Sequence, residues 1–162
     1  MHRRTLIIFL FVLLLQTSLL SNDLNLNTLI TKAKETNKHL LVLLGQTGCP
    51  YCKKMKKFIL NDPDVAPFLK ENLLFEYVDI KKNGEVKYKN FIGTKRKFAL
   101  HVGHRFYPST IFIDGNGNIV HEQPGVIRKA VFMNILEFIK RKSYNKSSFD
   151  DYMSEKEFEE DL

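Results

Sequence analysis

The feature that most constrains the fold is a short apolar run that leads into the chain's only two cysteines. Residues 39–44 read HLLVLL and end at Gly45, which predicts a strand buried on both faces. Cys49 and Cys52 follow after the short stretch QTG. Pro50 is placed to begin a helix, because proline is well tolerated in a first helical turn. The sequence therefore predicts a buried strand that ends at a Cys-x-x-Cys pair opening a helix.

The rest of the chain alternates between helix and strand patterns that suit one α/β domain. Apolar spacing predicts helices at about 25–36, 50–61, 62–69, 95–101 and 131–142, and strands at 74–80, 109–114 and 119–122. Strands 39–44 and 74–80 are separated by helices, which favours parallel pairing, whereas 109–114 and 119–122 form a hairpin. The lysine-rich stretch 81–97 is interpreted as a long loop. A central mixed sheet flanked by helices is the predicted architecture.

The first residues are typical of a secretory signal. Residues 1–4 include two arginines, residues 6–15 are an unbroken apolar run, and a polar stretch follows at 16–18. A spanning helix needs about 20 apolar residues, so this run is short for one and fits a signal peptide. Residues 1–21 are therefore predicted to direct export to the periplasm or an equivalent compartment. Because no clear cleavage site precedes residue 22, an uncleaved membrane anchor is the alternative.

Charge is unevenly distributed along the chain. The net charge is +7, but residues 143–162 carry seven acidic and two basic side chains, a balance of −5. With two arginines in the predicted signal, residues 22–142 carry +10. A basic domain can indicate nucleic-acid binding, but no groove-reading motif is present, so a solvated lysine-rich surface is the interpretation. Residues 143–162 are predicted to be an acidic tail whose aromatic spacing allows one more helix.

The placement of the two cysteines predicts redox chemistry. The first N–H groups of a helix lack intrahelical partners and carry the positive end of the helix dipole, so a thiolate on Cys49 would be stabilised there. A lowered thiol pKa makes Cys49 an attacking group near neutral pH. Cys52 shares the inward stripe with Met55 and Ile59, so it should be more buried. A purely structural bridge is the weaker interpretation, because closing so short a loop contributes only about 2 kcal/mol.

Two other side chains are candidates for tuning the cysteines. Lys53 lies one helical turn beyond Cys49 and would add positive charge, although an exposed lysine contributes little and a hydrated helix face is the simpler interpretation. His104 would tune the pair if it approached the sulfur atoms. A hydrogen-bonded surface histidine is the simpler interpretation for that position, since structural contacts also perturb titrating groups.

These features together resemble the thioredoxin fold over about residues 24–142. The resemblance rests on a strand, CPYC at a helix start, Tyr107-Pro108-Ser109 opening the hairpin, and a last helix. In that family the proline that matches Pro108 is cis and lies against the active-site disulfide, and a Tyr-Pro bond permits cis at little cost. The residues that the resemblance implies for substrate binding are Pro50, Tyr51, Tyr107, Pro108 and Ser109.

The sequence also departs from cytosolic thioredoxins. Thr47-Gly48 replaces the tryptophan that precedes their first cysteine, and Leu43 stands where they carry a buried acid that is thought to help proton transfer. The Pro-Tyr dipeptide between the cysteines resembles glutaredoxins, but no glutathione-binding pattern accompanies it. The signal, the polar insert and the tail are most similar to exported thioredoxin-like proteins of the sulfur-oxidation type.

Two other functional classes are alternatives. The cysteine pair together with His101-x-x-His104 supplies four ligands of the types that zinc prefers, although the first cysteine opens a helix and no second cysteine pair exists. The other alternative is a peptide-binding module with idle cysteines, in which Tyr51, Phe106 and Tyr107 would line the binding surface.

The sequence thus favours an exported thiol–disulfide oxidoreductase with one domain, residues 22–142. Cys49 is the predicted nucleophile, Cys52 resolves the mixed disulfide, and Pro108 receives the substrate backbone. No metal or organic cofactor is expected. The expected partners are substrate proteins with cysteines and a membrane-bound or exported redox partner, and a monomer is expected because no dimerisation domain fits in the length. The direction of exchange depends on the reduction potential relative to the partner, which the sequence does not determine.

Overall fold

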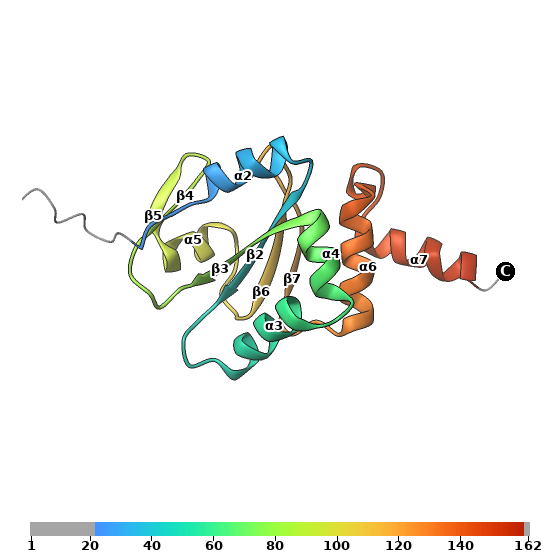
Figure 1. The fold of residues 1–162 in the computed structure, drawn as a ribbon, viewed down its shortest axis with the longest axis horizontal. Coiled ribbons are helices and arrows are strands. Elements are labelled where there is room, and N and C mark those ends of the chain that lie inside the picture. The colour runs from blue at the N-terminus through green and yellow to red at the C-terminus, as the bar shows by residue number, and fades with distance from the viewer. Residues whose placement is uncertain (1–21, 161–162) are drawn as a thin grey trace, which may run out of the picture.

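Strand β2 (His39–Gly45) is the centre of the fold, and every residue in it is buried. It pairs in parallel with β3 (Leu73–Asp79) and antiparallel with β6 (Ser109–Ile113), which in turn pairs antiparallel with β7 (Ile119–Pro124). In the computed structural model, which describes residues 22–160, helices cover both faces of this four-stranded sheet (Figure 1). The predicted α/β architecture with a central mixed sheet is confirmed.

Two hydrophobic cores lie on the two faces of this sheet, because successive side chains of a strand point to opposite faces. The helices are α2 (Leu26–Glu35), α3 (Pro50–Asn61), α4 (Val65–Asn72), α5 (Lys95–His101), α6 (Lys129–Lys140) and α7 (Phe149–Glu160). Leu41 and Leu43 of β2 share one core with α3, α4 and α6. Leu40 and Leu44 share the other with α2 and α5. The unbroken apolar run of β2 is thereby explained, since both of its faces are covered.

The stretch 81–97 corrects the sequence prediction. A long loop was expected there, but β4 (Glu85–Tyr88) and β5 (Phe91–Thr94) form a hairpin that pairs with β1 (Leu24–Asn25) in a second sheet. The hairpin turn contains Lys89 with φ 51°, where glycine or asparagine is usual. The side chain of Asn27 holds this turn, because it accepts a hydrogen bond from the Lys89 N–H (2.7 Å) and donates one to the Lys89 carbonyl (3.1 Å).

The acidic C-terminal region packs on the domain through its aromatic residues. Helix α7 follows a 3₁₀ turn (Ser143–Asn145), and the rings of Phe149 and Tyr152 lie 5.4 Å and 5.3 Å from that of Phe138 on α6. Phe149 and Tyr152, at the start of α7, thus extend the core that α6 contributes to. The predicted signal at 1–21 lies outside the described residues, and none of the helices within 22–160 has the length and apolar character needed to cross a membrane.

Candidate active site

Cys49 lies where the loop after β2 leads into α3, and it is the N-cap residue of that helix. The Cys52 N–H donates a hydrogen bond to the Cys49 Sγ (3.1 Å), so the first turn of α3 favours negative charge at this sulfur. Cys49 and Cys52 form a disulfide with their Cα atoms 5.3 Å apart. Cys49 is partly exposed, whereas Cys52 is only 1% exposed. An incoming sulfur therefore has access to Cys49 and not to Cys52.

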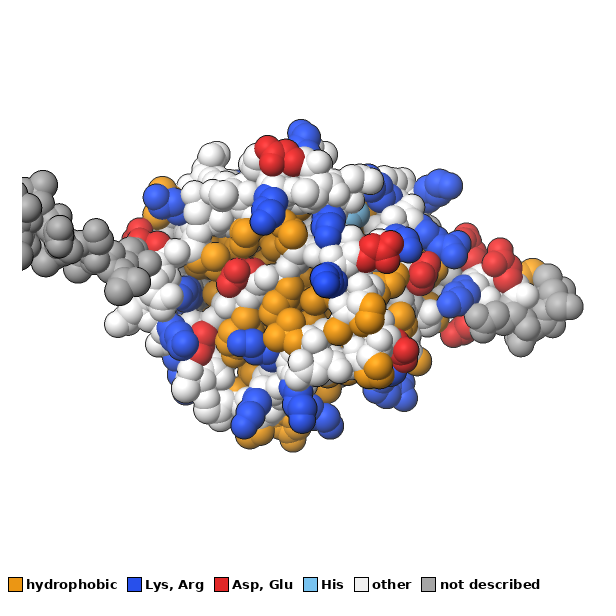
Figure 2. Space-filling model, viewed as in Figure 1, with side chains coloured by type: hydrophobic (Ala, Val, Ile, Leu, Met, Phe, Trp, Pro, Cys, Tyr) orange, Lys and Arg blue, Asp and Glu red, His pale blue; other side chains and the backbone are white. Residues whose placement is uncertain are grey.

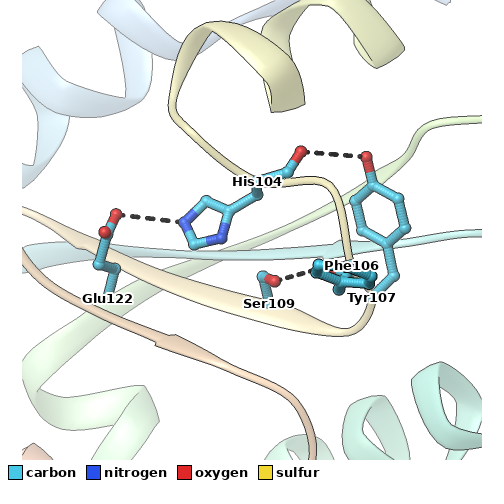
Figure 3. A network of polar contacts seen from close by, with 5 residues as sticks. All are labelled: His104, Phe106, Tyr107, Ser109 and Glu122. Atoms are coloured by element: carbon cyan, nitrogen blue, oxygen red, sulfur yellow. Dashed lines mark hydrogen bonds and ion pairs between the residues drawn. The ribbon is translucent and has the colours of Figure 1, made fainter.

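The loop before β6 lies at the same end of the sheet as the disulfide, because Ser109 pairs with Leu44 near the end of β2. The Tyr107-Pro108 peptide bond is cis, as the family resemblance implies. The buried Ser109 hydroxyl donates a hydrogen bond to the Phe106 carbonyl (2.7 Å) and closes the turn (Figure 3). Ser109 therefore shapes the loop, and its side chain is not exposed to solvent.

The backbone at Tyr107 is open to an incoming chain. The Pro108 carbonyl is occupied by the Gly125 N–H (2.8 Å), but the N–H and carbonyl of Tyr107 have no backbone partner within residues 22–160. Its hydroxyl makes only a long contact of 3.5 Å with the His104 carbonyl. An extended peptide can therefore pair with this residue in the way that a strand adds to a sheet edge.

Exposed aromatic and proline side chains lie at the same end of the sheet as the disulfide. Tyr51 is 66% exposed in the first turn of α3, and Phe106 is 81% exposed beside the cis-proline. Pro50 lines a groove beside Cys49, which we call the Cys49 groove. Its lining residues are Gln46, Thr47, Gly48, Cys49, Pro50, Lys53, Lys56, Tyr77, Asp79 and Lys82.

The sequence matches the family model described as a thioredoxin-like domain over residues 26–140. The chain belongs to the thioredoxin-like family. Solved structures agree on this fold. A thioredoxin-fold protein from Helicobacter pylori is 23% identical, with a TM-score of 0.63 over 80% of this chain and 92% of that one. A DsbH oxidoreductase (17% identity, TM-score 0.56, coverage 78% and 90%) and a Thermus thermophilus thioredoxin (19%, 0.54, 72% and 85%) are also similar. No curated protein matches the sequence.

Asp79 is a residue of this thioredoxin-like site that sequence reasoning missed. It ends β3, is 6% exposed, and accepts hydrogen bonds from the Thr47 N–H (3.0 Å), the Thr47 hydroxyl and the Lys81 N–H (3.1 Å). Burial raises the pKa of the Asp79 carboxyl, but these hydrogen bonds, together with the positive charge of Lys82, outweigh burial and hold the pKa below its ordinary value. The signal was present in the sequence, because parallel pairing of β2 and β3 places Asp79 beside Gly45, four residues before Cys49.

Tyr77 and Lys56 form another wall of the Cys49 groove. The Lys56 Nζ lies 4.4 Å from the centre of the Tyr77 ring, a cation–π contact. That ring covers Gly45 so closely that a Cβ there would lie 2.6 Å from the Tyr77 hydroxyl oxygen. Burial and the charge of Asp79 raise the pKa of the Tyr77 hydroxyl. Lys53, the predicted tuning lysine, is exposed and lines the same groove.

The two histidines considered as site residues contact other groups. His104 is buried, and its Nε2 lies 3.2 Å from a carboxylate oxygen of Glu122 on β7 (Figure 3). The hydrogen-bonded interpretation of His104 thus describes its contact, although the residue is not on the surface. His101 stacks on Phe91 with ring centres 4.6 Å apart. Within residues 22–160, no three His, Cys, Asp or Glu side chains lie together as a metal site requires, so the zinc alternative gains no support.

Proposed function

We propose that this protein is an exported thiol–disulfide oxidoreductase whose Cys49–Cys52 pair exchanges with cysteines of substrate proteins. The observation that carries the proposal is an accessible sulfur at the start of α3, bonded to a buried partner. An open backbone edge at Tyr107 lies at the same end of the sheet. One group supplies the chemistry and the other holds the substrate.

The exchange needs no group beyond the two cysteines and the substrate. In the reducing direction, the Cys49 thiolate attacks one sulfur of a substrate disulfide, which forms a mixed disulfide and releases a substrate thiolate. The Cys52 thiolate then attacks the Cys49 sulfur, releases the second substrate thiolate and leaves the Cys49–Cys52 disulfide. Two electrons pass from protein to substrate, and solvent protons neutralise the released thiolates. The reverse sequence oxidises a dithiol, and the relative reduction potentials set the direction.

The first turn of α3 assists both steps through its backbone. The Cys52 N–H that faces the Cys49 sulfur stabilises a thiolate there, whether that thiolate is about to attack or has just been displaced. A bound substrate that pairs with Tyr107 would be held in an extended conformation beside this sulfur. In this proposal Cys49 attacks the substrate, Cys52 resolves the mixed disulfide, and the backbone of Tyr107 aligns the substrate.

The cellular setting is part of the same proposal. The predicted signal at 1–21 would place the protein in an oxidising compartment, where disulfides persist. Its partners there would be proteins with cysteines and a membrane-bound or exported protein that resets its redox state. We propose that it acts as a monomer, and the likeness to sulfur-oxidation-associated thioredoxins stays a prediction.

Trapping with Cys52→Ser tests this function most directly. Without the resolving thiol, the Cys49 mixed disulfide should accumulate with a substrate protein and should disappear on reduction with dithiothreitol. Cys49→Ser, the matched control, should trap nothing. Iodoacetamide should alkylate Cys49 of reduced protein at pH 7 at least about tenfold faster than free cysteine. A Cys49 as slow as free cysteine, with no trapped partner, would contradict the proposal; unchanged partner binding by Cys49→Ser would favour the binding-module alternative.

A further inference from the structure

Cationic side chains flank the disulfide on two adjoining grooves. Besides the Cys49 groove there is a second one, the Tyr107 groove, lined by Gln46, Ile80, Lys81, Arg96, Leu100, Arg105, Phe106 and Tyr107. Gln46 lines both, so the two grooves meet at the loop that precedes Cys49. The Cys49 groove contributes three lysines, and the Tyr107 groove contributes one lysine and two arginines. Asp79 is the only carboxylate among these lining residues.

Two of these six cations interact with a carboxylate of the described chain, and only at longer range: the charge of Lys82 helps to lower the pKa of Asp79, and that of Lys56 opposes the rise in the pKa of Glu76. None of the six forms an ion pair with a carboxylate of residues 22–160, where the ion pairs involve other residues. Asp79 is already held by the Thr47 and Lys81 hydrogen bonds. Figure 2 shows blue side chains gathered over α3 along the lower edge and red ones over α7 at the right. A cleft lined by one sign of charge raises the local concentration of opposite charge.

The Tyr107 groove also offers apolar surface next to its charges. Phe106 is 81% exposed and Leu100 is 48% exposed, and both line this same groove. Apolar side chains that share a groove can mark a binding site, whereas single exposed ones are normal. Burial raises the pKa of the Tyr107 hydroxyl, and the positive charge of Arg96, which lines the same groove, opposes that rise. The surface that would align a substrate is therefore both basic and apolar.

We propose, on the basis of the proposed oxidoreductase function, that the two grooves select substrate proteins whose reactive cysteine is flanked by acidic residues and a large apolar residue. The acidic side chains would face the six cations, and the apolar side chain would cover Phe106 and Leu100. The charges act mainly on the rate of encounter, because exposed complementary charges steer association. The preference is therefore strongest at low ionic strength.

Three peptides that differ only in charge test this selection. Each carries one cysteine, as a mixed disulfide with 2-mercaptoethanol, beside a phenylalanine and four variable positions that are all Glu, all Gln or all Lys. The full-length reduced protein should reduce the Glu peptide at least about tenfold faster than the Lys peptide at roughly 10 mM ionic strength. At about 1 M salt, where the Debye length falls to about 3 Å, the two rates should converge.

A pair of triple variants tests the contribution of the Tyr107 groove, which holds three of the six cations. Lys81→Gln with Arg96→Gln and Arg105→Gln should lower the Glu-to-Gln rate ratio at least about threefold. Lys32→Gln with Lys34→Gln and Lys87→Gln removes the same charge from exposed positions that line neither groove. This control should keep the ratio of the wild-type protein. A ratio that falls equally in both triples would overturn the assignment to the grooves.

The outcomes separate this inference from the function on which it rests. Reduction of 2-hydroxyethyl disulfide, a small neutral substrate, reports the exchange chemistry alone. If this disulfide is reduced while the Glu, Gln and Lys peptides react at equal rates, the inference is wrong and the proposed function stands. If the reduced protein reduces no disulfide and the oxidised protein oxidises no dithiol, both are wrong. Equal peptide rates together with binding to anionic phosphatidylglycerol vesicles, lost in the groove triple, would assign the cations to a membrane surface instead.

Discussion

The two ends of strand β2 lead to regions that differ in how far their side chains are covered by the rest of the fold. Beyond Gly45 lies the active-site end, where aromatic rings are exposed and the groove cations form no ion pair with a carboxylate of residues 22–160. At the other end, the Nε2 of His39 lies 2.8 Å from the Tyr144 hydroxyl. There, the rings of α6, α7 and β7 pack against one another around Phe138, which is 1% exposed. The aromatic side chains at this far end are packed against one another within the fold, whereas those at the active-site end are exposed and open to a partner.

Because of this difference, we expect substitutions at the two ends to affect different quantities: the rate of disulfide exchange at one end and the free energy of unfolding at the other. Substitutions at the active-site end should change disulfide exchange far more than the free energy of unfolding, because the groups there await an external partner. Substitutions in the aromatic cluster should do the reverse. The predictions below test that division, beginning with the largest expected effect.

Cys49→Ala should lower the rate of 2-hydroxyethyl disulfide reduction by at least about a thousandfold, because the only other thiol, Cys52, is buried. Its free energy of unfolding should fall by only about 2 kcal/mol relative to the oxidised protein, the contribution of so short a loop. Urea unfolding of both proteins gives the second number. A variant that keeps a tenth of the exchange rate would contradict the role of Cys49.

Phe138→Ala should have the opposite profile. It removes a ring that contacts both Phe149 and Tyr152, and deleting a buried phenylalanine side chain costs about 3–5 kcal/mol. Phe158→Ala is the control, because that ring on α7 is 68% exposed and should change stability by about 0.5 kcal/mol or less. The exchange rate of the folded Phe138 variant should match the parent. A large loss of exchange in fully folded protein would show that the two ends are coupled.

Asp79→Asn tests a residue that lies at the active-site end and also contributes to the stability of the fold. Its carboxylate holds the loop before Cys49, and hydrogen bonds to a buried charge contribute about 1.5–3 kcal/mol. Because the pKa of Asp79 is lowered in the folded protein, this contribution is present above the ordinary pKa and is lost as the pH falls through the folded value. Urea unfolding should therefore show a destabilised variant at pH 7 and a smaller difference at pH 3. Thr47→Val is the matched variant, because it removes the hydroxyl that donates a hydrogen bond to Asp79. If Asp79→Asn left the free energy of unfolding unchanged at pH 7, the carboxylate would have no role in holding the loop.

Local patterns explain why much of the active-site end could be predicted. The strand at 39–44 and the helix opened by Pro50 depend on neighbouring residues only, so their apolar spacing and turn chemistry identified them. The cis bond before Pro108 is confirmed, but its prediction came from family resemblance and not from local physics. The pairing of Asp79 with Thr47 spans 32 residues, and only the sheet register brings the two together.

The second sheet could not be predicted from local patterns either, because it too depends on contacts between residues that are far apart in the sequence. Strands β4 and β5 have four residues each, too few for a convincing alternation. Their turn at Lys89 has no glycine and depends on Asn27, which is 62 residues away. A tertiary contact here supplies what the turn sequence lacks. For α7 the aromatic spacing did allow a helix, but that spacing could not identify Phe138 on α6 as the ring that Phe149 and Tyr152 contact.

Two histidines at the far end, the buried His39 and the half-buried His121, add a pH dependence to this stability. His121 lies among aromatic rings, with centroid distances of 5.0 Å to Phe149 and 6.0 Å to Phe138, and its Nε2 has no hydrogen-bond partner within the described chain. Burial lowers the pKa of His121, against the smaller opposing effects of Glu122 and Asp150. Burial, assisted by the positive charge of Lys142, also lowers the pKa of His39.

The smallest expected effect follows from these two histidines. A histidine whose pKa is lowered by folding is favoured in its neutral form, so its full contribution is present above the ordinary value of about 6.5. Stability is lost as the pH falls from there toward the lower folded value, because the unfolded chain binds more protons. The urea midpoint should therefore fall between pH 8 and pH 5.

His121→Phe tests this pH dependence, because it keeps an aromatic ring and removes the titrating group. Its urea midpoint should fall less over the same interval, while Cys49 alkylation at pH 7 stays unchanged. An identical slope in His121→Phe would place the pH dependence outside the aromatic cluster, and a change in alkylation would show that the two ends of β2 are not independent.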